Sequence, residues 1–223
     1  MNRSWYKLLY VAGSVVALAF TATAQAALLT LVNPAPADQQ YQQTLNSPCI
    51  FGDPSCNNPA GFGSVTFPAG GTGRTYTETS LSYTVGQIRA IVGNTFFIGI
   101  DVNTTTSPLA TEQLDFFDVF IGGVQQYVFD PASPGTSFVT TNNGNGFADA
   151  LLQSVDLAAF GDDVAVLFHV VQNNSTDGRE QYFLISTTNE PPLPPFAQIP
   201  EPASLALVGL GLLGLAGLRR KKA

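Results

Sequence analysis

The sequence predicts an all-β fold: a single β-sandwich or jelly-roll-like domain over residues 27–186, with a secretory signal before it and a membrane-directed tail after it. Three observations support this prediction. Short runs of β-branched and aromatic residues, separated by Gly, Asn, Asp, Ser and Pro, fill residues 27–186. Helical periodicity over about ten residues or more is hard to find there. About 160 residues are ample for one packed domain and few for two.

Residues 1–26 are organised as a secretory signal peptide. Arg3 and Lys7 precede an apolar run, Leu8 to Phe20, which ends in small residues. Ala24 and Ala26 supply the small-residue pattern of a cleavage site, so we expect cleavage after Ala26. The apolar run is short for a helix that must cross ~30 Å of hydrocarbon, and an uncleaved N-terminal anchor is the alternative.

The clearest strand pair in the domain is a hairpin from Leu114–Ile121 to Val124–Phe129. Its connection, Gly122-Gly123, allows the positive φ angles of a tight turn. One short helix over residues 111–121 is the alternative, but the paired aromatic residues and the glycines favour a strand. We expect a second hairpin from Asp163–Val171 to Glu180–Ile185, and further strands at Leu28–Val32, Ser64–Phe67, Arg74–Val85, Ile88–Val92, Thr95–Val102 and Ser137–Thr141.

Cys49 and Cys56 are the only cysteines in the chain. An even number of cysteines in an exported protein favours a disulfide, and the turn-rich segment between them lets the two ends meet. A metal site would need further ligands, and the sole histidine, His169, is remote in sequence.

Residues 164–171 place apolar side chains on both faces of one strand, which indicates a central strand. His169 on this strand is then a buried or edge histidine with a satisfied hydrogen bond, or alternatively a functional base or ligand; we adopt the first interpretation. Asp115 and Asp118 fall on opposite faces of their expected strand, which makes them poor partners for glycoside hydrolysis. Because no nucleophile elbow, zinc motif or phosphate loop is present either, the chain is predicted not to be an enzyme.

Two weak binding patterns remain. Asn143, Asn145 and Asp149 offer oxygen ligands on a glycine-rich turn, so a structural calcium ion is a hypothesis, although the pattern fits an EF-hand poorly; no other cofactor is expected. Tyrosine rings can stack on sugars and tolerate water, but they are more often core residues. The candidates for a glycan-binding face are Tyr76, Tyr83, Tyr127 and Tyr182.

The segment after the domain divides into a stalk and a tail. Residues 187–199 are rich in proline and should form an extended, polyproline-like stalk. Pro200-Glu201-Pro202 is followed by an apolar segment, Ala203 to Leu218. As a helix this segment would be about 24 Å long, which is workable as a transmembrane helix if basic side chains reach out to the interface. The basic cluster that would stay cytoplasmic is Arg219, Arg220, Lys221 and Lys222.

Residues 200–223 resemble the PEP-CTERM sorting signal of Gram-negative bacteria, because the tripeptide, the apolar span and the basic cluster occur in that order. The resemblance implies that an exosortase, itself a membrane protein, recognises Pro200, Glu201 and Pro202 and removes the helix, in bacteria that make exopolysaccharide. An ordinary membrane anchor that keeps its tail is the alternative reading.

Charge is segregated along the chain. Residues 27–202 contain all 16 acidic residues against three arginines, which gives a formal charge of −13 with no lysine. Such a surface repels polyanions, so nucleic acid is not expected as a partner. The sequence therefore predicts an exported protein of the periplasm, cell surface or matrix, held transiently in the inner membrane, with a structural, adhesive or exopolysaccharide-binding domain. A secreted carbohydrate-active enzyme is the alternative.

Overall fold

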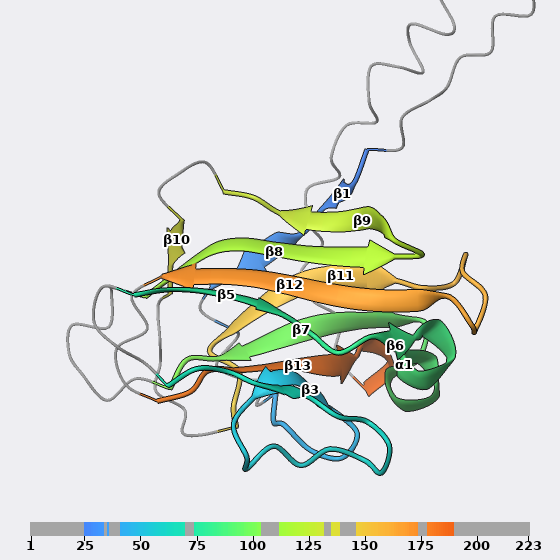
Figure 1. Ribbon diagram of the computed structural model, residues 1–223, viewed down its shortest axis with the longest axis horizontal. Helices are drawn as coiled ribbons and strands as arrows, with labels where there is room; N and C mark the ends of the chain where they lie inside the picture. The colour runs from blue at the N-terminus through green and yellow to red at the C-terminus, as the bar shows by residue number, and fades with distance from the viewer. Residues whose placement is uncertain are drawn as a thin grey trace, which may run out of the picture. The chain divides into compact units, whose positions relative to one another are not determined.

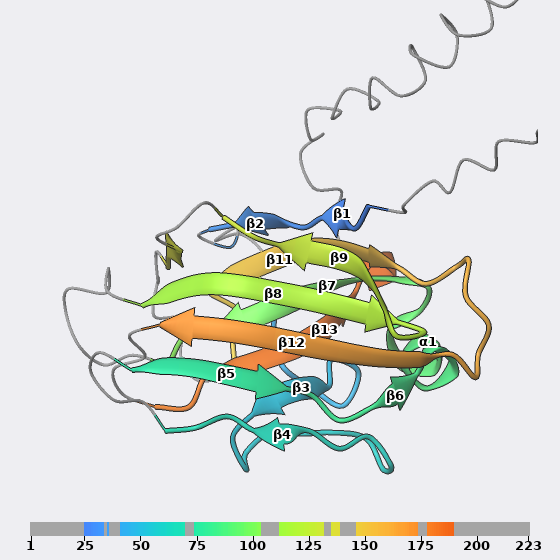
Figure 2. The same cartoon turned by 45° about the horizontal axis from the view of Figure 1, so that its top comes forward.

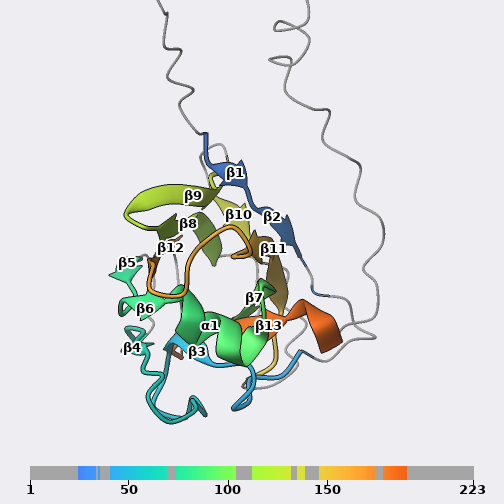
Figure 3. The ribbon, with the colours of Figure 1, turned by 90° about the vertical axis from the view of Figure 1, so that its right-hand side faces the viewer.

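The computed structural model describes residues 25–33, 35, 41–69, 74–103, 112–131, 135–138, 146–173 and 178–189. Within these residues two β-sheets pack face to face, and the view in Figure 3 looks along the space between them. The all-β class is confirmed, and the described chain adds one short α-helix. The elements are β1 (Ala27–Leu28), β2 (Thr30–Val32), β3 (Cys49–Gly52), β4 (Val65–Thr66), β5 (Thr75–Thr79), β6 (Tyr83–Thr84), α1 (Val85–Val92), β7 (Thr95–Asp101), β8 (Gln113–Ile121), β9 (Val124–Phe129), β10 (Thr136–Ser137), β11 (Ala150–Asp156), β12 (Ala165–Asn173), β13 (Gln181–Ser186) and the 3₁₀ turn η1 (Thr187–Asn189).

The first sheet has the strand order β1-β9-β8-β12-β5, with β10 also paired to β8 and β6 to β12. The second sheet has the order β2-β11-β7-β13-β3-β4. In Figure 1 the strands of the first sheet run across the upper part of the molecule, with β7, β13 and β3 of the second sheet below. β12 lies between β8 and β5, as expected for a central strand.

The predicted strand Leu28–Val32 is divided between the two sheets. β1 pairs in parallel with β9 of the first sheet, whereas β2 pairs with β11 of the second. Leu29, between them, is buried, and its N–H donates to the carbonyl of Val128 at 2.7 Å. Figure 2 shows the resulting ribbon, which connects the edges of both sheets.

The core lies between the sheets and is aromatic at its centre. Phe117 of the first sheet stacks on Tyr182 of the second, with ring centroids 5.9 Å apart. Phe168 packs against Phe117 from the neighbouring strand β12, at 6.3 Å. All three side chains are fully buried, and each buried ring contributes roughly 2–3 kcal/mol through the removal of apolar surface from water.

The strands predicted at Arg74–Val85 and Ile88–Val92 are partly wrong, because α1 replaces them after β5 and β6. A capping box starts this helix: the Gln87 N–H donates to Thr84 Oγ1 at 3.1 Å, and the Thr84 N–H donates to Gln87 Oε1 at 2.8 Å. Gly93, with φ +83°, ends it. The helix has eight residues, too few to produce a long periodic pattern, and its apolar face is Val85, Ile88 and Val92.

Arg89 fastens α1 to the turn between β11 and β12. Its guanidinium donates to the carbonyls of Leu157 and Phe160, both at 2.9 Å, and forms an ion pair with Asp162. In Figure 1, α1 lies at one end of the two sheets.

The first predicted hairpin is confirmed, since β8 and β9 pair antiparallel through Gly122 and Gly123, with φ +62° and +78°. The helical alternative for residues 111–121 is therefore wrong, because Gln113–Ile121 is a strand. The second predicted hairpin is also wrong: β12 belongs to the first sheet and β13 to the second. These two strands face each other across the core, where the Tyr182 hydroxyl donates to Gln172 Oε1.

Several other predictions differ from the structure or lie outside it. The prediction missed β3 and β11, and it extended the strand near Ser137 to residues 139–141, which lie outside the described residues. The signal before Gln25, the stalk beyond Asn189, the expected helix 203–218 and the basic cluster are outside them as well. In the part of the chain that the structure describes, no helix has the length and apolar character needed to cross a membrane.

Candidate functional site

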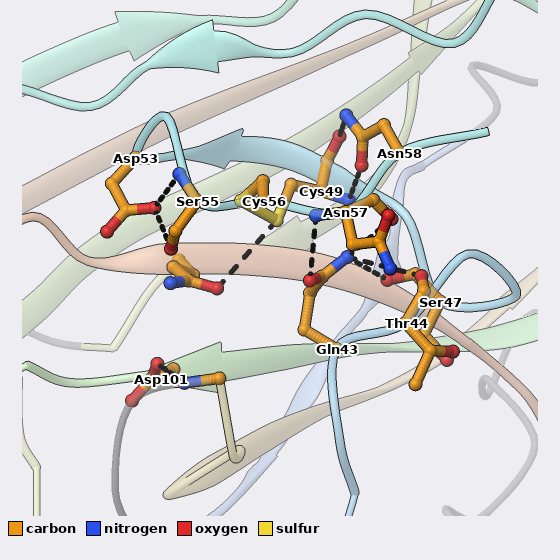
Figure 4. The surroundings of a disulfide bond; sticks show 12 residues. Gln43, Thr44, Ser47, Cys49, Asp53, Ser55, Cys56, Asn57, Asn58 and Asp101 are labelled. Carbon is orange, nitrogen blue, oxygen red and sulfur yellow. Dashed lines mark hydrogen bonds between the residues drawn. A yellow bond between two sulfur atoms is a disulfide. The ribbon is translucent and has the colours of Figure 1, made fainter. Parts of the chain in front are cut away.

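The predicted disulfide is present, and side-chain hydrogen bonds surround it (Figure 4). Cys49 and Cys56 are bonded with their Cα atoms 6.1 Å apart. Cys49 is the first residue of β3, so the bond ties the loop after this strand back to the second sheet. A Cβ added to Gly52 would lie 2.3 Å from Cys56 Sγ, so glycine provides the space that the disulfide occupies.

Two side-chain amides hold the same loop by imitating strand pairing (Figure 4). Asn58 accepts from the Cys49 N–H at 2.7 Å and donates to the Cys49 carbonyl at 3.2 Å. Gln43 forms the same pair of bonds with the backbone of Asn57, both at 3.0 Å. Backbone groups that no strand reaches are thus satisfied. The disulfide therefore has a structural role, and neither cysteine is left as a free thiol.

Three buried carboxylates lie where β7, β11 and β13 begin or end. Asp149 Oδ2 accepts from the Val102 N–H at 3.0 Å, and Glu180 Oε2 accepts from the Asn103 N–H at 2.6 Å. Asp101 accepts from the Gly146 N–H. Burial raises the pKa of Asp101 to about 7, with smaller contributions from the charges of Asp149 and Asp53, although the Gly146 N–H opposes the shift.

The calcium hypothesis involves Asn143, Asn145 and Asp149, of which the first two lie outside the described residues. Asp149 lies beside Asp101, but their carboxylates already accept backbone N–H groups. The described residues contain no group of three or more His, Cys, Asp or Glu side chains arranged to hold a metal ion. Calcium binding therefore stays a prediction.

The four candidate tyrosines are used within the fold. Tyr76, Tyr83 and Tyr182 are buried. The hydroxyl of Tyr83 donates to the Gly63 carbonyl at 2.8 Å, and burial raises its pKa well above the usual value. Tyr127 is half-buried, and its hydroxyl bonds to the Asp156 backbone at 2.9 Å. Tyr76, Tyr83 and Tyr182 are therefore core residues, and Tyr127 is the one of the four candidates that keeps partial exposure.

His169 has a charged partner that the sequence did not reveal. Its Nδ1 lies 3.3 Å from Asp118 Oδ2, and the two residues are directly opposite each other on β12 and β8. Burial raises the pKa of the Asp118 carboxyl, while hydrogen bonds from Gln125 and His169 oppose the shift. The side chain of His169 is 27% exposed and that of Asp118 is 4% exposed, so the pair is open to solvent mainly through the imidazole.

The prediction that Asp115 and Asp118 occupy opposite faces is wrong. The pairing of β8 with β12 shifts between Phe116 and Leu114, so a bulge at Asp115 interrupts the alternation. Asp115 accepts a hydrogen bond from Asn173, which lies four residues beyond His169 and on the same face of β12. Asp115 and Asp118 therefore share the face of the first sheet that points away from the core.

The sorting residues Pro200, Glu201 and Pro202 lie outside the described residues, as do Arg219, Arg220, Lys221, Lys222 and Ala24. Ala26 is half-buried directly before β1, so the expected cleavage would leave Ala27, the first residue of that strand, at the new N-terminus.

Comparison with known families identifies this tail. A family model for the PEP-CTERM protein-sorting motif matches residues 198–221. No curated protein and no solved structure matches the chain. The chain thus carries a PEP-CTERM protein-sorting motif, which makes it an exported protein addressed to an exosortase through a membrane-associated sorting signal.

Proposed function

We propose that the β domain acts outside the inner membrane as a non-enzymatic structural or adhesive domain that binds neutral glycans. The sorting motif at residues 198–221 carries this proposal, because it directs the chain to the envelope and to processing by an exosortase. The disulfide between Cys49 and Cys56 is compatible with that oxidising destination.

The charge of the exported segment selects the partner class within this proposal. Residues 27–202 carry 16 acidic residues against three arginines, a charge of −13, and no lysine. Acidic polysaccharides and nucleic acids would be repelled, whereas neutral polysaccharides would not. An exported segment of this charge is suited to a matrix of neutral exopolysaccharide.

The tail defines the proposed route. The apolar segment 203–218 holds the exported chain in the inner membrane, with residues 219–222 on the cytoplasmic side. Exosortase cleavage near residues 200–202 then frees the domain for the cell surface or matrix.

The intact mass of the protein recovered from the envelope and from the medium tests this route. Loss of the residues beyond the 200–202 region is expected, and a Pro200→Ala/Pro202→Ala variant should keep them. Wild-type protein that retains its tail in every fraction would instead indicate a simple membrane-anchored domain.

A carbohydrate-active enzyme is the second candidate, and one observation favours it. Asp115 and Asp118 share the face of the first sheet that points away from the core, and a glycosidase needs two carboxylates that can flank one scissile bond. Release of reducing ends from neutral glycans, abolished by Asp118→Asn, would establish this activity in place of the proposed binding role.

A further inference from the structure

The outward face of the first sheet carries a polar row across three neighbouring strands. Thr79 of β5 pairs with His169 of β12, which pairs with Asp118 of β8. The chain neighbours of Asp118 and His169, such as Phe117 and Phe168, are core residues, so these two side chains point away from the second sheet. Figure 2 shows β8, β12 and β5 side by side on this face.

The polar groups of this row are fixed before any ligand arrives. Gln125 Nε2 donates to Asp118 Oδ1 at 2.7 Å, and His169 Nδ1 contacts Asp118 Oδ2. Among the described residues, no hydrogen bond uses His169 Nε2 or Gln125 Oε1. His169 Nε2 and Gln125 Oε1 are therefore available to a ligand, and the contacts of both side chains with the buried Asp118 carboxylate fix their orientation.

Half-buried aromatic and aliphatic side chains flank the row on both sides. Phe116 pairs with Val171 on one side, and Phe120 pairs with Leu167 on the other. The ring of Phe116 packs edge-on against the imidazole of His169, with centroids 6.2 Å apart. Successive rows lie about 7 Å apart, because two residues of a strand separate them. Exposed hydroxyls of Thr77 and Thr79 border this surface on β5.

This alternation of apolar and polar rows suits a sugar better than a protein. A pyranose presents an apolar C–H face, which stacks on an aromatic ring, and hydroxyls that both donate and accept. An apolar protein surface on this face would remove the water that hydrogen-bonds to Asp118, His169 and Gln125 and would supply no hydrogen bonds in its place. Burying polar groups without partners costs free energy. The charge of −13 and the absence of lysine from residues 27–202 disfavour an anionic ligand.

We propose that the outer face of the first sheet is a binding site for a neutral polysaccharide chain, in which Phe116 stacks on a sugar ring while Asp118, His169 and Gln125 bind its hydroxyls. The site rests on the proposed function and adds a location and a mode of recognition to it. Phe120, about 13 Å further along β8, provides the position for a second sugar unit.

The test is affinity electrophoresis of the full chain in mild detergent, in gels that contain dextran, mannan, cellulose-derived oligosaccharides or xylan. Retardation by at least one of these neutral glycans is expected for the wild-type chain. Phe116→Ala, His169→Ala and Gln125→Ala should each weaken binding roughly tenfold, the loss typical of one stacking contact or one good hydrogen bond. The controls are Leu45→Ala, whose side chain is 49% exposed beside the disulfide loop, and Asp163→Asn at an exposed turn.

Each outcome separates the site from the proposed function. Binding by the wild-type chain that is lost in the three face variants and kept in both controls supports the site. Binding kept in all variants overturns the site and leaves glycan binding standing. If the wild-type chain binds no glycan in the panel, both proposals fail. A wild-type dimer that Phe116→Ala dissociates in size-exclusion chromatography also overturns the site, because a second copy then occupies this face. Unchanged circular dichroism and melting temperature of His169→Ala and Gln125→Ala show that a loss of binding is not a loss of folding.

Discussion

Replacement of Asp101 by asparagine should stabilise the protein, and increasingly so as the pH rises. Asp101 is 2% exposed and lies near Asp149 and Asp53. Its folded-state pKa is about 7, against an ordinary value of 3.8. Asparagine keeps an oxygen that can accept from the Gly146 N–H, and it carries no charge that burial penalises.

The direction of the pH effect follows from proton binding. At a pH between these two pKa values, Asp101 holds a proton in the folded chain and has lost it in the unfolded chain. The contribution of Asp101 to the free energy of unfolding is therefore fully present below about pH 4 and is lost as the pH rises through about 7. Three pKa units correspond to about 4 kcal/mol as an upper limit. We expect the stability difference between Asp101→Asn and wild type to grow by about 2–4 kcal/mol between about pH 4.5 and about pH 8.

Urea unfolding of both chains, with the disulfide intact and across this pH range, measures the difference. Carboxylates that do not interact with Asp101 titrate equally in both chains and cancel, so the difference reports Asp101 together with its coupling to Asp149 and Asp53. Asp163→Asn, at an exposed position, is the control and should give a flat difference curve. A difference for Asp101→Asn that is constant or shrinks as the pH rises would refute the argument.

Three further predictions concern stability. Cys49→Ser/Cys56→Ser should lower the free energy of unfolding by about 2 kcal/mol, because the disulfide no longer restricts the unfolded chain. Thermal unfolding should then show a Tm lower by roughly 5 °C, and wild type under reducing conditions should show the same decrease. An unchanged Tm would contradict this prediction. Arg89→Ala should cost about 2 kcal/mol because its charged hydrogen bonds to the carbonyls of Leu157 and Phe160 are lost. Asp162→Asn should cost less than about 0.5 kcal/mol because that partner is exposed, and equal costs for the two variants in urea unfolding would show that the ion pair dominates. Gly99→Ala should cost about 1–3 kcal/mol by calorimetry, since its Cβ would approach Phe183 and Ile185 within 3 Å. Gly161→Ala, whose Cβ would meet Val164 only at an ordinary contact distance of 4.0 Å, is the control and should be neutral; a neutral Gly99→Ala would mean that Phe183 and Ile185 move aside freely.

Features set by neighbouring residues were predictable from the sequence. Gly122-Gly123 identified the hairpin of β8 and β9. The even number of cysteines and the turn-rich segment between Cys49 and Cys56 identified the disulfide. The apolar residues on both faces of Val164 to Val171 correctly placed β12 at the centre of a sheet. Each of these signals is local, so the sequence contains the whole of it.

Features that depend on distant contacts were not predictable. Pairing β12 with β13 was the simplest interpretation of two adjacent strands, yet Gln172 and Tyr182 meet across the core and place the strands in different sheets. The bulge at Asp115 is visible only in the pairing of β8 with β12. Asp118, the partner of His169, lies 51 residues away in sequence, so no local sequence pattern predicts the polar row.

The two outward sheet faces differ in a way that bears on where a ligand can bind. On the second sheet, the outward side chains include Phe97 and Ile185, each only 7% exposed, and Phe183 and Leu151, which are fully buried. Gly99 between them has no side chain, and this lets Phe183 and Ile185 pack over the strand. That face is therefore filled by its own side chains. On the first sheet, the corresponding positions Phe116, Phe120 and His169 remain partly exposed. Of these two faces, only that of the first sheet offers an aromatic surface together with oriented polar groups among the described residues. Substitutions on the outward face of the second sheet should therefore change stability, whereas substitutions on the outward face of the first sheet should change ligand binding.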